Sequence, residues 1–339
     1  MAAPHRERGG IIGKLVGVVF VLALIAAAGA GYYAWQLDQK IKAPGPLSET
    51  SILWIERGNG VATVGTKLDE MGAIEDTFHF KVASRINKLA PDLQAGEYEI
   101  PANASVAEIV TLLKEGKPLL RFVTLPEGLT TKQIIARINE APMLEGEVTL
   151  DPGEGTLLPE TYSYQRGDAR DSIITRMTAA HDDVINELWP NRAADLPIKT
   201  QMEAVILASI VEKETGIAAE RPRVAAVFTN RLKRGMRLQS DPTIIYGLTG
   251  GEPLGRGIRQ SELRGETPYN TYVIRGLPPT PIANPGRESL AAVLNPADTK
   301  DLYFVADGTG GHVFATSLAE HNSNVAKWRK IERERRAAN

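Results

Sequence analysis

The chain carries near its N-terminus a stretch, Leu15–Trp35, that contains no charged residue. At a rise of about 1.5 Å per residue, a helix over this stretch is just long enough to cross a hydrocarbon core of about 30 Å. The sequence therefore predicts a transmembrane helix over residues 15–36. The folded part of the protein must then be built from the residues that follow.

The residues at the two ends of this stretch orient the predicted helix. We expect residues 1–14 to form a cytoplasmic tail and the bulk of the chain to lie outside the cytoplasm, although Lys40 and Lys42 on that side weaken the bias. A cleaved signal peptide ending near Ala28-Gly29-Ala30 is the alternative, disfavoured because the apolar stretch is too long and continues into aromatic residues. The cations before the stretch are Arg6, Arg8 and Lys14, and the aromatic residues that close it are Tyr32, Tyr33 and Trp35.

Composition excludes several classes of function. The 339 residues suffice for about two domains, and a hydrophobic content of 43% suffices for their cores. A net charge of −2 gives no basic field for a nucleic-acid partner. The chain has no cysteine, and its five histidines are scattered without the spacing of metal ligands, so neither a disulfide nor a metal site is expected. No phosphate-binding loop or GxSxG motif is present.

A first folded segment is expected over residues 51–118, after a stiff proline-containing spacer over residues 37–50. Alternating strand patterns at Ile52–Glu56 and Tyr98–Ile100 enclose two helical patterns, which gives a βααβ order. This segment resembles a LysM-like module, a small unit that binds the glycan backbone of cell-wall polymers in known families. A purely structural spacer domain is the alternative.

A pattern of strand, proline, hydroxyl cap and helix occurs twice along the chain. Ser105 precedes a helical pattern after the strand at Tyr98–Ile100, and Thr130 precedes one after Phe122–Leu125. The recurrence predicts stacked βα units.

The helical run Leu207–Thr215 places two glutamates two residues apart. Positions two apart on a helix point about 200° away from each other, so Glu212 and Glu214 cannot act as a pair. Glu214 lies over the larger apolar side chains of the run. We therefore expect apolar surroundings to raise the pKa of Glu214, as a proton donor requires. The alternative is a solvated glutamate on an amphipathic helix.

Polar and aromatic residues after this helix are candidates for a sugar-binding cleft, because aromatic faces pack on sugar C–H groups and amides pair with hydroxyls. Asp241 precedes Pro242 and is expected first of all to cap a helix. The same aromatic and amide residues could equally hold loops together. The candidates for the cleft are Gln239, Asp241, Tyr246, Tyr269, Asn270, Tyr272 and Glu160.

Several motifs together resemble the endolytic murein transglycosylase family, the YceG-like membrane-anchored proteins, from about Leu47 to the C-terminus. They are ASIVEKET, RLKRGMRLQSDPTIIYG, ETPYNTY, GLPP with NPG, and LYFVADGTGGHVF followed by EHN. The resemblance implies an α+β protein with a transmembrane helix, a LysM-like βααβ subdomain and a mixed α/β catalytic domain over residues 119–330. Glu214, the second acid of EKE, matches the family's catalytic glutamate.

The resemblance also implies a reaction. Glu214 would protonate the oxygen between N-acetylmuramic acid and N-acetylglucosamine, then take a proton from the muramyl C6 hydroxyl, which attacks C1 and forms a 1,6-anhydro ring. Neither a metal nor a cofactor is needed. Peptidoglycan glycan strands would be the substrate, the cytoplasmic membrane the anchor and a peptidoglycan synthase a candidate partner; cleavage of nascent strands would terminate their elongation.

Two rival functions stay open at this point. A hydrolytic muramidase would use Asp241 or Glu160 as a second carboxylate. A catalytically silent anchored module would bind glycan and recruit synthases. From the sequence, Glu214→Gln is expected to abolish cleavage, and Glu212→Gln is expected to have only a mild effect on it.

Overall fold

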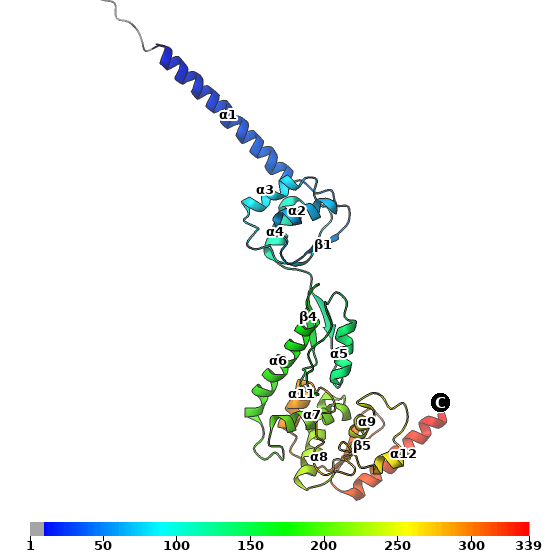
Figure 1. The fold of residues 1–339 in the computed structure, drawn as a ribbon. Coiled ribbons are helices and arrows are strands. Elements are labelled where there is room, and N and C mark those ends of the chain that lie inside the picture. Colours follow the sequence, from blue (N-terminus) through cyan, green and yellow to red (C-terminus); the bar gives the residue numbers. More distant parts are fainter. Residues whose placement is uncertain (1–9, 339) are drawn as a thin grey trace, which may run out of the picture. The chain divides into compact units, whose positions relative to one another are not determined.

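The computed structural model describes residues 10–338, which form two compact units (Figure 1). The first unit ends at Leu120 and the second begins at Arg121, next to the boundary expected after residue 118. Both units combine helices with short antiparallel strand pairs. The expected mixture of helices and strands is thus confirmed.

Helix α1 (Gly10–Lys42) contains the apolar stretch and is drawn in blue in Figure 1. Over Gly13–Lys42 it is long and apolar enough to cross a membrane, and within residues 10–338 no other helix is. The large apolar side chains between Leu15 and Trp35 are exposed, as Leu22 is at 59%. Of the predicted tail, residues 1–9, which include Arg6 and Arg8, lie outside the described residues.

The first unit has the predicted βααβ order. Strands β1 (Ser51–Ile55) and β2 (Gly96–Ile100) pair antiparallel, with Leu53 opposite Tyr98. Helices α2 (Val61–Glu70) and α3 (Thr77–Ile86) lie between them in the sequence, and α4 (Val106–Glu115) follows. A capping box between Ser105 and Glu108 starts α4, and Gly116 ends it in the left-handed conformation. The sequence alone predicted both the cap at Ser105 and the end of the helix at Gly116.

The spacer expected over residues 37–50 is not a free linker. Leu37, Ile41 and Leu47 pack in the core of the first unit, where Ile41 is 8% and Leu47 7% exposed. Backbone hydrogen bonds join Gly45 N to Asn103 O and Asn103 N to Leu47 O. The expectation failed because local composition reports the stiffness of a proline-rich stretch but not what packs against it.

The second unit begins with its own strand pair, formed by β3 (Arg121–Thr124) and β4 (Thr161–Tyr164). Helix α5 (Thr131–Glu140) starts at a capping box made by Thr130, and α6 (Arg170–Leu188) follows β4. Because β2 pairs with β1 and β3 with β4 in separate sheets, the two βα segments do not form the predicted stack.

Helix α7 (Gln201–Glu214) is the centre of the second unit. Its residues 204–211 are all buried, and α8 (Arg221–Lys233) and α11 (Arg287–Leu294) pack against it. A helix buried on every side has no single apolar stripe, which bears on the sequence argument for Glu214. The remaining elements are short helical turns at Trp189–Asn191 and Ala218–Glu220, helices α9 (Asp241–Thr249), α10 (Gln260–Arg264) and α12 (Leu318–Ala338), and strands β5 (Tyr303–Ala306) and β6 (His312–Ala315).

Candidate active site

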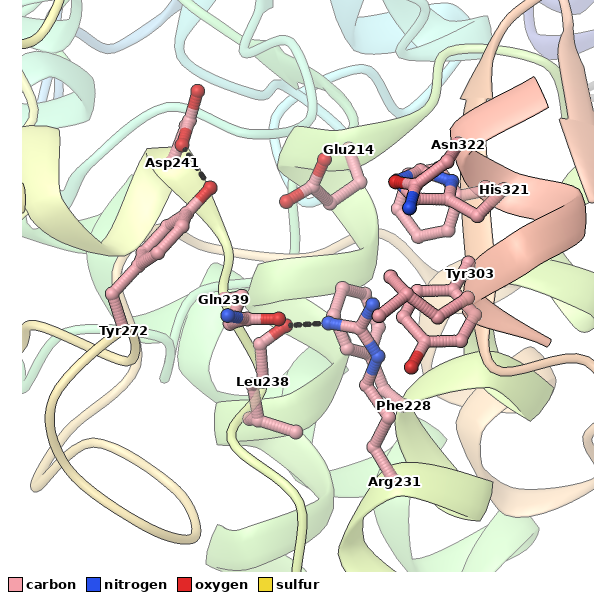
Figure 2. Close-up of a pocket in the computed structure, with 12 residues that line it drawn as sticks. Glu214, Phe228, Arg231, Leu238, Gln239, Asp241, Tyr272, Tyr303, His321 and Asn322 are labelled. Carbon is pink, nitrogen blue, oxygen red and sulfur yellow. Dashed lines mark hydrogen bonds between the residues drawn. The ribbon is translucent and has the colours of Figure 1, made fainter. Parts of the chain in front are cut away.

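Glu214 is the last residue of α7, and its carboxyl group faces a cavity of about 420 Å³. Figure 2 shows this carboxyl group between Asp241 and Tyr272 on one side and residues of β5 and α12 on the other. The cavity is lined by Glu214, Phe228, Arg231, Leu238, Gln239, Asp241, Tyr272, Tyr303, Phe304, Leu318, His321 and Asn322. Segments far apart in the sequence therefore meet around one carboxyl group.

Burial raises the pKa of Glu214 from its ordinary value of 4.5 to about 7. The negative charge of Asp241 raises the pKa as well, while a hydrogen bond from Ser240 and the charges of His312 and Arg231 lower it. The predicted rise in pKa is thus confirmed. A carboxyl group that titrates near neutral pH can both give and take a proton there.

The Ser240 hydroxyl donates to Oε1 of Glu214 at 2.5 Å. Ser240 is itself fully buried. Its backbone N–H donates to Thr271 Oγ1 at 2.9 Å, and Thr243 Oγ1 donates to its carbonyl at 2.7 Å. Because every polar group of the serine is held by the fold, one oxygen of the Glu214 carboxyl group is fixed in place, and within residues 10–338 no side chain hydrogen-bonds to Oε2.

Asp241 does not cap its helix as predicted. It is the first residue of α9, and Ser240 occupies the N-cap position without a side-chain capping bond. The Asp241 carboxylate accepts a 2.7 Å hydrogen bond from the Tyr272 hydroxyl, drawn as a dashed line in Figure 2. The prediction missed by one residue because proline is tolerated at N2 as well as at N1, so an Asp-Pro pair does not settle the register.

Four predicted cleft residues do not line this cavity. Asn270 is 1% exposed, and its side-chain amide donates to the carbonyls of residues 262, 263 and 265. Tyr269 pairs with Thr280 through their hydroxyls, and Tyr246 donates to Glu154 Oε2 while lining a second cavity of about 320 Å³. Glu160 is exposed. Of the candidates, the structure brings together Glu214, Gln239, Asp241 and Tyr272.

Sequence reasoning missed the opposite wall of the cavity. Arg231 is 7% exposed and donates to the carbonyls of Leu238 and Leu302, both at 2.6 Å. The ring of His321 stacks on Tyr303 with centroids 5.1 Å apart. One signal was available: Arg231 lies three residues after Phe228 on a buried face of α8, where a charge is unusual.

Glu212 belongs to a separate network behind the cavity. Its side chain is 5% exposed, its Oε1 lies 3.3 Å from Arg221 Nη2, and its Oε2 accepts from Gly286 N at 3.0 Å. Arg221 also pairs with Glu127 at 2.9 Å. The two glutamates do face different surroundings, as predicted, but Glu212 is as firmly held as Glu214. Within residues 10–338 no three His, Asp or Glu side chains form a group that could hold a metal ion.

Comparison with known proteins gives a consistent picture. The sequence profile of the YceG-like family matches residues 53–327. A protein of Streptococcus pneumoniae named endolytic murein transglycosylase is 28% identical over 362 residues, covering 92% of this chain. The chain spans 64% of the length of that relative. A Bacillus subtilis protein of the same name is 30% identical, covering 81% of this chain and 83% of its own.

A solved structure is also similar. The crystal structure of a putative YceG-like protein from Listeria monocytogenes is 29% identical in sequence and has a TM-score of 0.51. The match covers 81% of this chain and 98% of that one.

Proposed function

This chain belongs to the YceG-like family, and from that premise we propose that it is an endolytic lytic transglycosylase of peptidoglycan. The bond cleaved is the β-1,4 linkage between N-acetylmuramic acid and N-acetylglucosamine in nascent glycan strands. The observation that carries the proposal is the carboxyl group of Glu214, whose pKa is about 7 and which faces a cavity of about 420 Å³. The names of the pneumococcal and Bacillus relatives support the same activity.

The chemistry needs one group that acts first as an acid and then as a base. Protonated Glu214 gives its proton to the glycosidic oxygen, and the bond from that oxygen to C1 of the muramyl residue breaks. The muramyl C6 hydroxyl then attacks C1, and the Glu214 carboxylate takes the proton of that hydroxyl. The carboxyl group ends in its starting state, and the product is a 1,6-anhydro ring.

The hydrogen bond from Ser240 assigns the two oxygens of Glu214. Because Oε1 accepts from Ser240, the oxygen that exchanges protons with the substrate is Oε2. Glu214 and Ser240 are both held by buried backbone, so the direction of this oxygen is set before substrate binds. Gln239, Asp241 and Tyr272 line the same cavity and would contact the sugar rings.

A hydrolytic muramidase is the second candidate, favoured by one observation. Asp241 is a carboxylate in the same cavity as Glu214, and a hydrolase acting on a glycosidic bond ordinarily uses two carboxyl groups. The Tyr272 hydroxyl bonded to Asp241 would then help to orient it. Glu160 is not a candidate for that role because it lies outside the cavity.

The other parts of the chain fit a role at the membrane surface. Helix α1 would anchor the protein in the inner membrane as a single span, with the N-terminus in the cytoplasm and both units outside it. The βααβ order of the first unit supports a LysM-like, glycan-binding role there. Cleavage of strands still being polymerised would limit their length, with a peptidoglycan synthase as the natural neighbour.

The test is digestion of purified uncrosslinked glycan strands by the detergent-solubilised full chain, with the Glu214→Gln variant as the matched control. Products are read by mass spectrometry, since an anhydro end lacks the water that a hydrolytic end carries. Internal fragments ending in 1,6-anhydromuramic acid, absent with Glu214→Gln, are expected.

Other outcomes have definite meanings. Hydrated reducing ends would show that the protein is a hydrolytic muramidase and not a lytic transglycosylase. Strands that stay intact but bind to the protein would show a catalytically silent glycan-binding module and exclude both enzymes. Full activity of Glu214→Gln would remove Glu214 from the chemistry.

A further inference from the structure

Helix α3 carries two large apolar side chains that the first unit leaves exposed. Phe80 and Ala83 point into the core and are at most 1% exposed. Phe78 and Ile86 point outward, 47% and 70% exposed. Val82 lies between them at a spacing of four residues, half-buried against the core of the first unit, so the three side chains follow one face of the helix at the edge of that core. Large exposed apolar side chains in a row are the pattern of a surface that meets another apolar phase.

Cations flank this face. Lys81 and Arg85 lie along one side of the row Phe78, Val82 and Ile86, and both are exposed. Within residues 10–338 neither cation forms an ion pair. An apolar row bordered by free cations is the composition of a helix that lies in the interface of an anionic membrane.

Helix α3 lies next to the predicted membrane anchor, which points to lipid as the partner of this face. The last turns of α1 contact α3, and Leu37 and Ile41 share a core with Phe80. Lys40 and His79 line the same small cavity between the two helices. At about 1.5 Å per residue, Ile41 lies about 9 Å beyond Trp35, within reach of the headgroup layer. Figure 1 shows α3 beside the end of α1.

We propose that the face of α3 formed by Phe78, Val82 and Ile86 docks on the lipid surface around the anchor, with Lys81 and Arg85 on anionic headgroups. The docking rests on α1 spanning the membrane. This interfacial contact would add to the anchor itself. The two together would fix the height and the tilt of the first unit relative to the bilayer.

The experiment uses the absence of cysteine from the chain. Single cysteines carrying a nitroxide are placed at Ile86, at the exposed polar Thr66 on α2 as the water-facing control, and at Leu22 within α1 as the control for insertion. The full chain is reconstituted in vesicles of phosphatidylglycerol and phosphatidylcholine. Collision of each nitroxide with oxygen, which dissolves in lipid, and with a nickel chelate, which stays in water, reports its depth.

The label at Ile86 should meet the nickel chelate about fivefold less often than the label at Thr66, as interfacial burial implies. Lys81→Glu with Arg85→Glu should return the Ile86 label toward the value at Thr66. If the label at Ile86 is as accessible to the nickel chelate as the label at Thr66, while the label at Leu22 is shielded, the docking is overturned and the membrane anchor is retained. Open labels at both Ile86 and Leu22 would overturn both.

A second copy of the chain is the remaining occupant to exclude. Dipolar broadening of the Ile86 signal that disappears on dilution with unlabelled chain would show that two α3 helices meet face to face, and would overturn the lipid assignment. A signal independent of dilution is expected.

Discussion

The Ser240 hydroxyl and Oε1 of Glu214 are joined by a 2.5 Å hydrogen bond across 26 residues of sequence. Ser240 is itself buried and held by Thr243 and Thr271, so the bond is built into the fold. One hydroxyl thereby fixes the direction of the proposed catalytic group and lowers its pKa against the larger effect of burial.

Ser240→Ala should change the pH profile of cleavage as well as its rate. The hydrogen bond stabilises the charged form of Glu214 and lowers its pKa, so its loss should raise the pKa above about 7. The protonated acid then persists to higher pH, so the alkaline limb of the pH profile of kcat/KM should shift to higher pH. Loss of a hydrogen bond to a charged group predicts a fall in kcat/KM on the order of 10-fold.

The matched control is Ser163→Ala on β4, which lies outside the cavity and should leave both rate and profile unchanged. A Ser240→Ala enzyme that is slower but keeps its alkaline limb in place would show that the serine acts on structure alone.

Glu214 should make the stability of the protein depend on pH. Its folded pKa of about 7 lies above the ordinary 4.5, so between these values the folded chain binds more protons than the unfolded chain. The free energy of unfolding should therefore fall as pH rises through this window. Glu214→Gln removes the effect, and the variant should be more stable than wild type by about 3 kcal/mol at pH 8.

Urea denaturation at the two ends of the window checks this prediction. At pH 4 the variant and the wild type should unfold at similar urea concentrations, because the carboxyl group is then mostly protonated in both states. An equal gain in stability at pH 4 and pH 8 would contradict the raised pKa.

Glu212→Gln should destabilise the protein, although its expected effect on cleavage stays mild. Glu212 accepts from both Arg221 and Gly286, and its side chain is 5% exposed. Neutralising one member of a buried pair predicts a loss of about 2 kcal/mol in unfolding free energy, because Arg221 keeps Glu127 as a second partner. Cleavage per folded molecule should be retained, since Glu212 does not line the cavity.

A double-mutant cycle with Arg221→Met isolates the pair. The combined variant should lose less stability than the two single losses together, because either substitution alone breaks the same contact. Strict additivity would mean that the pair contributes nothing.

Gly155→Ala should destabilise the second unit by about 2 to 4 kcal/mol, since overpacking adds to the cost of an unfavourable backbone. Gly155 has φ of 81°, and an added Cβ would lie 2.6 Å from Cβ and Cγ of Pro281. Gly146→Ala is the matched control, because its φ is 71° with nothing within 4 Å of the added atom. Thermal denaturation of the two variants separates backbone strain from steric overlap, and equal losses would rule out the overlap.

What the sequence predicted best was local. Ser105 and Thr130 start helices because a hydroxyl followed three residues later by Glu or Gln forms a capping box wherever the flanking segment is helical. Glu214 was proposed both from its surroundings and from the motif that carries it. The surroundings argument predicted its raised pKa for an incomplete reason, because α7 is buried on all sides and Glu212 is also enclosed.

What the sequence could not predict was tertiary. Asn270 and Tyr269 have the composition of a sugar-binding loop, yet the backbone of their own loop and Thr280 satisfy their polar groups. Arg231, Tyr303 and His321 reach the cavity from three different elements. Their meeting depends on how α8, β5 and α12 pack, and no local pattern encodes that.

The burial of Leu37 and Ile41 in the first unit defines where the chain could be shed from a membrane without damage. A protease acting just after Trp35 would release the rest of the chain with the core of the first unit complete. Cleavage after Lys42 would instead remove Leu37 and Ile41 from that core. The segment that resembles a linker is therefore one that the fold of the first unit needs.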